Sequence, residues 1–243
     1  MEPLFGLDPL IWNILATFAV FVYIMSIIKF MDFLVTKGFP QDISRKIIHV
    51  AAGSWVIFWP LFYAGHWSYV LNIAVAVLWT LLFIVKGLTA NPEDYAVKTM
   101  TRSGNPKELL RGPLFFTIVM EILGIFFFIQ YPAVVTMGIL GWGDGLAPVI
   151  GKHFGKRKYK LLGREKTIEG SIGMFLFGLI GSLILVLIVQ PVGMPRTLES
   201  LILSILIACI VATIVEALSP ADVDNILIPL ATMFTLYSIP ISA

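Results

Sequence analysis

The chain has 243 residues, of which 58% are apolar and 13% are charged, and its mean hydropathy is +0.91. Soluble domains are about 45–50% apolar and about 25% charged, so this composition excludes a soluble globular domain. The net charge of +2 is too small to indicate nucleic acid as a partner, and the single cysteine, Cys209, excludes an internal disulfide and a cysteine-rich metal site.

Eight apolar runs separated by polar breaks predict eight membrane-spanning helices, because about 20 apolar residues cross the core of a bilayer. In chain order the runs are Leu10–Ile28, Ile47–Tyr63, Tyr69–Val85, Pro113–Gln130, Ala133–Ile150, Ser171–Val189, Leu198–Leu218 and Ile226–Ile241. We therefore expect an all-α, polytopic membrane protein with a single integral-membrane domain over residues 1–243.

The basic residues predict how these helices are oriented. All of them except Arg196 lie in loops that follow the first, third and fifth runs. The positive-inside rule then places these loops in the cytoplasm and both termini outside. The polar stretches Gly87–Gly112, Gly151–Gly170 and Ser219–Asn225 fall on that same side, so we expect an active site at the cytosolic face. The membrane that we expect is the plasma membrane of a prokaryote, with the endoplasmic reticulum as the alternative.

The stretch from Gly141 to Lys156 carries an acid, Asp144, inside an apolar run. Charged side chains within a membrane are costly and usually functional. Glycines in this stretch allow a backbone to approach a phosphate, but they also allow helices to pack closely, and both interpretations stay open. The stretch is not a Walker A loop, because three residues rather than four separate Gly151 from Gly155 and no Ser or Thr follows the lysine.

A loop with seven basic residues runs from Lys152 to Lys166 and closes with the segment Lys166–Ser171. Lysines and arginines neutralise phosphate oxygens, and the N–H groups at the start of a helix bind anions. The same cluster would also attract anionic lipid headgroups, and Thr167, Glu169 or Ser171 could be capping residues. On charge alone the two interpretations are equal.

Polar residues gather again near the end of the seventh run, at Glu216, Asp222, Asp224 and Asn225. Mg²⁺ prefers oxygen ligands and is usually held by one or two carboxylates together with the phosphates of a substrate. Glu216 lies inside the apolar run, where a charge without a role is costly. A solvated or capping turn is the default interpretation for Asp222.

Basic residues also stand near the starts of the second and fourth runs. Arg45 and His49 are four residues apart and so share one helix face, where they could grip a phosphate or orient a substrate hydroxyl. Arg45 and Lys46 are, however, also expected at a membrane boundary from topology alone. Arg111 precedes Pro113, for which a simple helix start is an equal alternative. Glu121 should face the protein interior.

These segments extend over residues 44–230 and read Arg45-Lys46-x-x-His49, Gly112-Pro113, Gly143-Asp144-x-x-Ala147, Gly151, Gly155-Lys156, Lys166-Thr-x-Glu-Gly-Ser171, Glu216 and Asp224-Asn225. Together they resemble the polyprenol kinase family, which includes dolichol kinase and phytol kinase. The central part, Asp144–Ser171, is also similar to the phosphatidate cytidylyltransferases. Those enzymes typically close with a Gly-His-Gly-Gly segment followed by acids, whereas Glu216–Asn225 is closer to the kinases.

The resemblance implies a CTP-dependent kinase that phosphorylates the hydroxyl of a membrane isoprenoid alcohol of the polyprenol, dolichol or phytol type, with Mg²⁺ as cofactor. Asp144, Glu216 and Asp224 would hold Mg²⁺ and act in catalysis. The residues implied in nucleotide binding are Gly143, Gly145, Gly151, Lys152, Gly155, Lys156, Lys166, Thr167, Glu169, Gly170, Ser171 and Asn225. Those implied in contacts with substrate or phosphate are Arg45, Lys46, His49 and Arg111.

A phosphatidate cytidylyltransferase of the CDP-diacylglycerol synthase type is the alternative enzyme. A transporter is the third interpretation, but transport sites lie near the bilayer midplane between repeats, whereas the polar groups here collect at one face. The expected partners are the lipid alcohol, CTP and membrane lipids, without nucleic acid, and the oligomeric state stays open.

Overall fold

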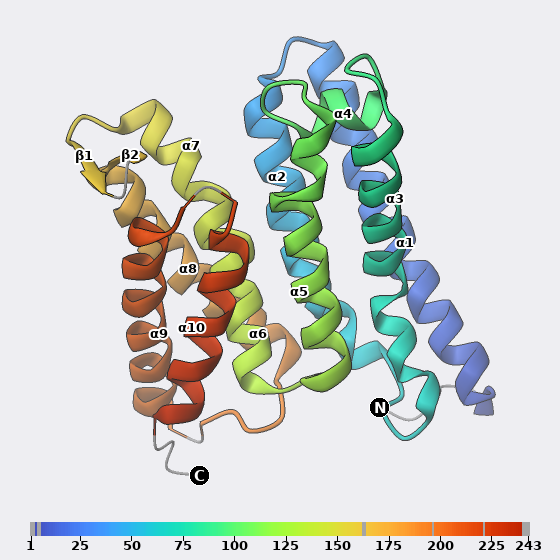
Figure 1. Ribbon diagram of the computed structural model, residues 1–243. Helices are drawn as coiled ribbons and strands as arrows, with labels where there is room; N and C mark the ends of the chain where they lie inside the picture. The colour runs from blue at the N-terminus through green and yellow to red at the C-terminus, as the bar shows by residue number, and fades with distance from the viewer. Residues whose placement is uncertain (1–2, 4–5, 162–163, 196, 221, 240–243) are drawn as a thin grey trace. The chain divides into compact units, whose positions relative to one another are not determined.

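A computed structural model describes residues 3, 6–161, 164–195, 197–220 and 222–239 of the chain. The chain forms two compact units, whose helices are shown in Figure 1. Unit 1 comprises Met1–Ala51 and Ile57–Phe128, and unit 2 comprises Ala52–Val56 and Ile129–Ala243. The single domain over residues 1–243 stays a prediction.

Helices of α and 3-10 geometry build the first half of the chain. They are α1 (Pro9–Thr36), α2 (Gln41–Gly53), η2 (Ser54–Leu61), η3 (Trp67–Ile73), α3 (Ala74–Thr89), α4 (Tyr95–Met100), η4 (Pro106–Leu110) and α5 (Gly112–Phe126). α1 begins where Asp8 Oδ1 accepts a hydrogen bond from Leu10 N at 2.8 Å, with Pro9 as the first helical residue. Within unit 1, α3 packs against α5, and Thr80 Oγ1 donates to Glu121 Oε1 at 2.5 Å. Glu121 therefore faces a neighbouring helix of its unit, as expected.

Unit 2 is a helical bundle around one long helix that changes geometry in its middle. Its elements are α6 (Tyr131–Gly138), η5 (Ile139–Asp144), α7 (Gly145–Phe154), β1 (Lys158–Leu161), β2 (Arg164–Thr167), α8 (Ile168–Val189), α9 (Leu198–Leu218) and α10 (Asp224–Ser238). In the continuous helix Tyr131–Phe154, 72% of the most apolar stretch is buried, against 33% in α9. The helix formed by α6, η5 and α7 is therefore the centre of unit 2, and α8, α9 and α10 pack around it.

Six helices of the described residues are long and apolar enough to cross a membrane, which identifies a multi-pass membrane protein. They are Pro9–Thr36, Trp67–Thr89, Pro106–Phe126, Tyr131–Phe154, Ile168–Val189 and Leu198–Leu218. The second expected span corresponds to α2 and η2, where the helical geometry changes at Ser54 and Arg45 and Lys46 lie in the first turns. The eighth corresponds to α10, which has 15 residues, and its expected end at Ile241 lies outside the described residues. The count of eight and the orientation of the termini stay predictions, and Arg196 also lies outside the described residues.

The basic loop between the fifth and sixth expected spans contains an antiparallel β-hairpin, so the all-α expectation is wrong for this segment. β1 and β2 pair in the register Lys158↔Thr167, Tyr159↔Lys166, Lys160↔Glu165 and Leu161↔Arg164. Directly opposed residues of an antiparallel pair share a face of the sheet. Tyr159 and Lys166 therefore lie on one face, and Lys158, Lys160 and Glu165 lie on the other.

Candidate functional site

Asp144 ends a π-helical segment in the middle of the central helix of unit 2. η5 joins α6 to α7 without a break, and the i→i+5 geometry of π segments is rare and frequent at functional sites. Asp144 is 7% exposed, on an element that contacts α8, α9 and α10. The acid predicted within the membrane thus lies inside the bundle and does not face lipid.

Close packing explains two of the glycines near Asp144. A Cβ atom added to Gly53 would lie 2.6 Å from Gly141 Cα, and one added to Gly143 would lie 2.8 Å from the carbonyl oxygen of Met174. Both distances are shorter than a Cβ atom tolerates, so these backbones can approach each other only at glycine. The packing interpretation is supported here, and a nucleotide contact of Gly143 stays a prediction.

Three further glycines surround Thr167 at the start of α8. Cβ atoms added to Gly151 and Gly170 would each lie 2.9 Å from Thr167 Oγ1, and one added to Gly155 would lie 2.6 Å from Thr167 Cγ2. Thr167 Oγ1 accepts a hydrogen bond from Gly170 N at 3.1 Å, so Thr167 is the N-cap of α8. The capping alternative is confirmed for Thr167, and its role toward a nucleotide is not tested.

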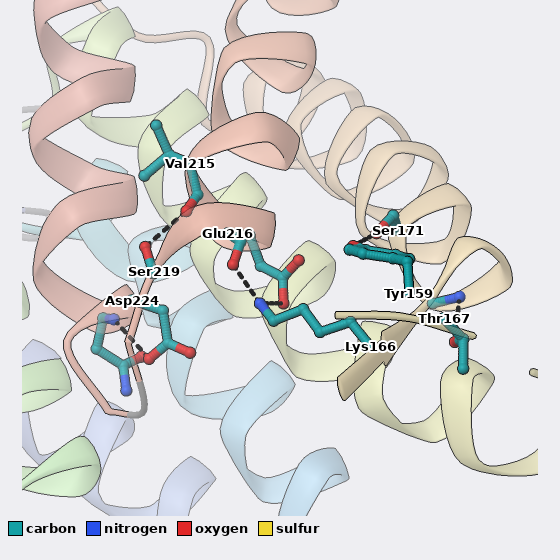
Figure 2. A network of polar contacts seen from close by, with 10 residues as sticks. Tyr159, Lys166, Thr167, Ser171, Val215, Glu216, Ser219 and Asp224 are labelled. Carbon is teal, nitrogen blue, oxygen red and sulfur yellow. Dashed lines mark hydrogen bonds and ion pairs between the residues drawn. The ribbon is translucent and has the colours of Figure 1, made fainter. Parts of the chain in front are cut away.

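The hairpin is fixed to the helices by its inward face. Tyr159 Oη and Ser171 Oγ, at the start of α8, are 2.6 Å apart. The base of the hairpin is held separately, because Ile168 N donates to Arg157 O at 2.9 Å and Arg157 N donates to Glu169 Oε2 at 3.2 Å. Tyr159 and Lys166 point from the hairpin toward α8 and α9 in Figure 2.

Lys166 and Glu216 form a buried ion pair between β2 and the end of α9. Lys166 Nζ lies 2.5 Å from Glu216 Oε1, and each side chain is 12% exposed. The ammonium group also donates to the backbone carbonyl of Glu216, near the negative end of the dipole of α9. Two residues predicted for the site, 50 positions apart in sequence, are thus brought together as partners of each other.

The outward face of the hairpin carries a second ion pair that differs in exposure. Lys158 Nζ lies 2.6 Å from Glu165 Oε1, with 65% and 60% of the two side chains exposed. The hydrogen bond from Lys158 lowers the pKa of the Glu165 carboxyl, and the same contact raises the pKa of the Lys158 ammonium group. This pair joins the two strands to each other and not to the helices.

The turn between α9 and α10 holds the remaining acids of the predicted site. Ser219 Oγ donates to Val215 O at 2.6 Å, and Asp222 has a left-handed backbone with φ of 69°. Asp224 then begins α10, and its Oδ1 accepts a hydrogen bond from Asn225 N at 3.0 Å. Asp224 and Asn225 are each 8% exposed, and Figure 2 shows Asp224 across the turn from Glu216.

Other predicted residues of this unit differ in exposure. Gly145 is buried at the first position of α7, whereas Lys152 and Lys156 are exposed on the solvent side of α7 and of the segment after it. The role of these two lysines in phosphate binding stays a prediction.

The four residues predicted to contact substrate or phosphate belong to unit 1. Arg45 Nη1 donates to Thr101 O at 2.5 Å, which ties α2 to the segment after α4. The His49 ring lies against Phe116, with centroids 4.2 Å apart. Lys46 is half-buried and Arg111 is exposed. These contacts fix α2 within unit 1, and the substrate role of all four residues is not tested.

The buried acids of unit 2 offer carboxylate oxygens, which are the ligands that Mg²⁺ prefers. Among the described residues, no group of three or more His, Cys, Asp or Glu side chains is arranged to hold a metal ion. Mg²⁺ needs fewer protein ligands, because it keeps waters and takes phosphate oxygens. Asp144, Glu216 and Asp224 are buried oxygen donors on η5, α9 and α10, which contact one another. One or two of them suffice for Mg²⁺ bound with a nucleotide, and this assignment stays a prediction.

Tyr159 is the residue of this region that the sequence analysis did not single out. The signal was a pair of short runs separated by two residues, one of them a glycine: Lys158–Leu161, in which polar and apolar residues alternate, and Arg164–Thr167. The density of charge concealed this hairpin pattern.

The chain is similar to plant proteins over most of its length. It is 34% identical over 220 residues to probable phytol kinase 1, chloroplastic, of Oryza sativa subsp. japonica, which covers 87% of this chain and 69% of that protein. It is 32% identical over 202 residues to phytol kinase 1, chloroplastic, of Arabidopsis thaliana, which covers 81% and 66%. Farnesol kinase, chloroplastic, of Arabidopsis thaliana is 29% identical over 190 residues, covering 77% and 62%.

These alignments span between 62% and 69% of the length of the three relatives. No family model matches the chain, and no solved structure matches it.

Proposed function

Because the chain belongs to the phytol kinase family of isoprenoid alcohol kinases, we propose that it transfers the γ-phosphoryl group of CTP to the hydroxyl of a membrane isoprenoid alcohol. Phytol and farnesol, for which the relatives are named, are both isoprenoid alcohols. Such substrates dissolve in the bilayer that a multi-pass protein shares with them. We place the reaction at the cytosolic face, where the positive-inside rule puts the basic hairpin.

The Lys166–Glu216 pair is the observation that carries the proposal. It joins the cation proposed for phosphate to an acid proposed for the metal, in a buried position between β2 and the end of α9. Asp144 and Asp224 lie on elements that contact α9. Phosphoryl transfer requires mainly positioning and neutralisation of charge, and opposite charges held in a buried site supply both.

The charged residues divide the chemistry in this proposal. Lys166 neutralises oxygens of the transferred phosphoryl group, and an acid such as Asp224 accepts the proton of the attacking hydroxyl. One or two of the acids Asp144, Glu216 and Asp224 would hold Mg²⁺, which would neutralise phosphate charge when bound. Burial of these acids keeps bulk water away from the γ-phosphate, so that phosphoryl transfer to the alcohol is favoured over hydrolysis of the nucleotide.

The test is the fate of the γ-phosphate. Purified protein in lipid nanodiscs is incubated with γ-labelled CTP or ATP and with phytol, farnesol or dolichol, and label is measured in the lipid phase. We expect label in the lipid with CTP and an isoprenoid alcohol. A second incubation with phosphatidate and γ-labelled CTP tests the alternative, because a cytidylyltransferase would release labelled pyrophosphate from these substrates. Release of pyrophosphate without lipid label would reject the kinase in favour of the alternative.

Substitutions test whether the proposed acids carry the reaction. Asp144→Asn and Glu216→Gln are expected to lower kcat by about 100-fold or more, because each removes a charge from the reacting site. Glu199→Gln is the matched control, since Glu199 is an exposed acid in the first turn of the same helix as Glu216, and should leave activity unchanged. An Asp144→Asn variant that phosphorylates the alcohol at the wild-type rate would contradict the proposal.

A further inference from the structure

The inward face of the hairpin is held at two points by side chains that lie opposite each other. Tyr159 and Lys166 are register partners, so their Cβ atoms are about 4.5–5.5 Å apart on one face. The Tyr159 hydroxyl contacts Ser171 at the start of α8 at 2.6 Å, and the Lys166 ammonium contacts Glu216 at the end of α9 at 2.5 Å. This single cross-strand pair therefore links the two helices, as Figure 2 shows.

The two side chains of this pair differ in stiffness. Tyrosine has a planar ring and few rotatable bonds, whereas lysine has a flexible four-carbon stem. The place of the Lys166 ammonium group therefore depends on how firmly the backbone of β2 is held. The outward pair Lys158–Glu165 does not hold it, because it joins strand to strand. Besides the base of the hairpin and the Thr167 cap of α8, the Tyr159 hydroxyl is a rigid contact directly opposite Lys166.

We infer that Tyr159 is a positioning residue for nucleotide binding and acts through Lys166. The inference rests on the proposed function, because it takes Lys166 as a ligand of a nucleoside triphosphate. While Tyr159 is hydrogen-bonded to Ser171, the hairpin stays in place as the Lys166 ammonium group exchanges its contact with Glu216 for one with a phosphate oxygen. Without the hydroxyl, the hairpin carries Lys166 away from the phosphate, while the charge of Lys166 is unchanged.

Nucleotide affinity measured with and without Lys166 tests this inference. Binding of labelled CTP to the full chain is measured by equilibrium dialysis in the presence of Mg²⁺, beside the kinase assay. Tyr159→Phe is expected to raise the Kd for CTP by about threefold to tenfold, the worth of one hydrogen bond. The value of kcat is expected to fall as well, because Lys166 also neutralises the transferred phosphoryl group. In a Lys166→Met background, Tyr159→Phe should change the Kd no further.

Two variants keep this test decisive. Ser171→Ala removes the other half of the hydrogen bond and should raise the Kd to the same extent, and no further when it is combined with Tyr159→Phe. Tyr237→Phe is the matched control, since it removes a tyrosine hydroxyl that donates to Gln130 at 2.7 Å, at the end of α10 opposite to Asp224. The Kd of this variant for CTP should equal that of the wild type.

The inference and the proposed function fail in different ways. A wild-type Kd for Tyr159→Phe, or an equal rise of the Kd in the Lys166→Met background, overturns the role of Tyr159 even when the wild type is an active kinase. A wild type that labels no isoprenoid alcohol overturns the proposed function, whatever the Kd values of the variants.

Discussion

Replacing Lys166 by methionine is expected to destabilise the folded protein by about 3 kcal/mol, because it leaves the Glu216 carboxylate buried without its cation. The two charges are 2.5 Å apart and each side chain is 12% exposed, so solvent screens them little. At an effective dielectric constant of about 20 they attract by roughly 7 kcal/mol, and desolvation offsets more than half of this. Glu216→Gln should cost less, about 1 to 1.5 kcal/mol, since Lys166 keeps a backbone carbonyl as acceptor.

The double variant Lys166→Met/Glu216→Gln measures the interaction between the two charges separately from the effect of each single substitution. It removes both charges, so its cost should be only about 1 kcal/mol, and the coupling energy should exceed about 2 kcal/mol. The free energy of unfolding is measured in mixed micelles, with sodium dodecyl sulfate as denaturant and tryptophan fluorescence as the signal.

The outward pair of the same hairpin provides the control. Lys158 and Glu165 are 65% and 60% exposed, so Lys158→Met and Glu165→Gln should leave the stability unchanged within error. Strictly additive effects of Lys166→Met and Glu216→Gln would refute the reasoning, because they would show that the two buried charges do not depend on each other.

Two further predictions concern packing and pH. A Cβ atom added to Gly138 would lie 2.5 Å from Ser182 Cα, whereas the nearest atoms to one added to Gly178 are 3.7 Å away. In the same unfolding assay, Gly138→Ala should therefore lower the free energy of unfolding by about 1–3 kcal/mol, and Gly178→Ala should leave it unchanged. Equal stabilities of the two variants would contradict the close approach of α6 and α8. The hydrogen bond from Lys86 lowers the pKa of the Asp94 carboxyl, so this contact stabilises the fold at pH values above the unfolded pKa of Asp94. Its contribution is lost as the pH falls through the lowered pKa, and the difference in Tm between wild type and Asp94→Asn should vanish there; a constant difference down to lower pH would refute it.

Among the described residues, six of the eight predicted spans correspond to helices that are long and apolar enough to cross a membrane. The run around Ile47 failed to give one long apolar helix, because its first turns carry Arg45 and Lys46 and its geometry changes at Ser54. Local composition does not reveal such a change of helix type. The hairpin was missed for a different reason, since each strand is only four residues long and polar and apolar residues alternate only in the first.

The candidate site was predicted by residue type but not by pairing. Lys166 and Glu216 were both singled out, yet 50 residues separate them, and nothing local indicates that each is the partner of the other. The glycines show the same limit. Gly143 and Gly151 carry the same residue letter whether they approach a phosphate or a neighbouring helix, and their close packing against Met174 and Thr167 became visible only in the structure.

The π segment Ile139–Asp144 makes the direction of Asp144 sensitive to a change in chain length. A π turn spans one residue more than an α turn, so deletion of a single residue within the segment would let regular α geometry close over it. Each residue of an α-helix advances the side-chain direction by about 100°. Because the π turn absorbs one extra residue, such a deletion would leave α6 and α7 nearly in phase with each other, and the change in side-chain direction would be confined to the segment that ends at Asp144.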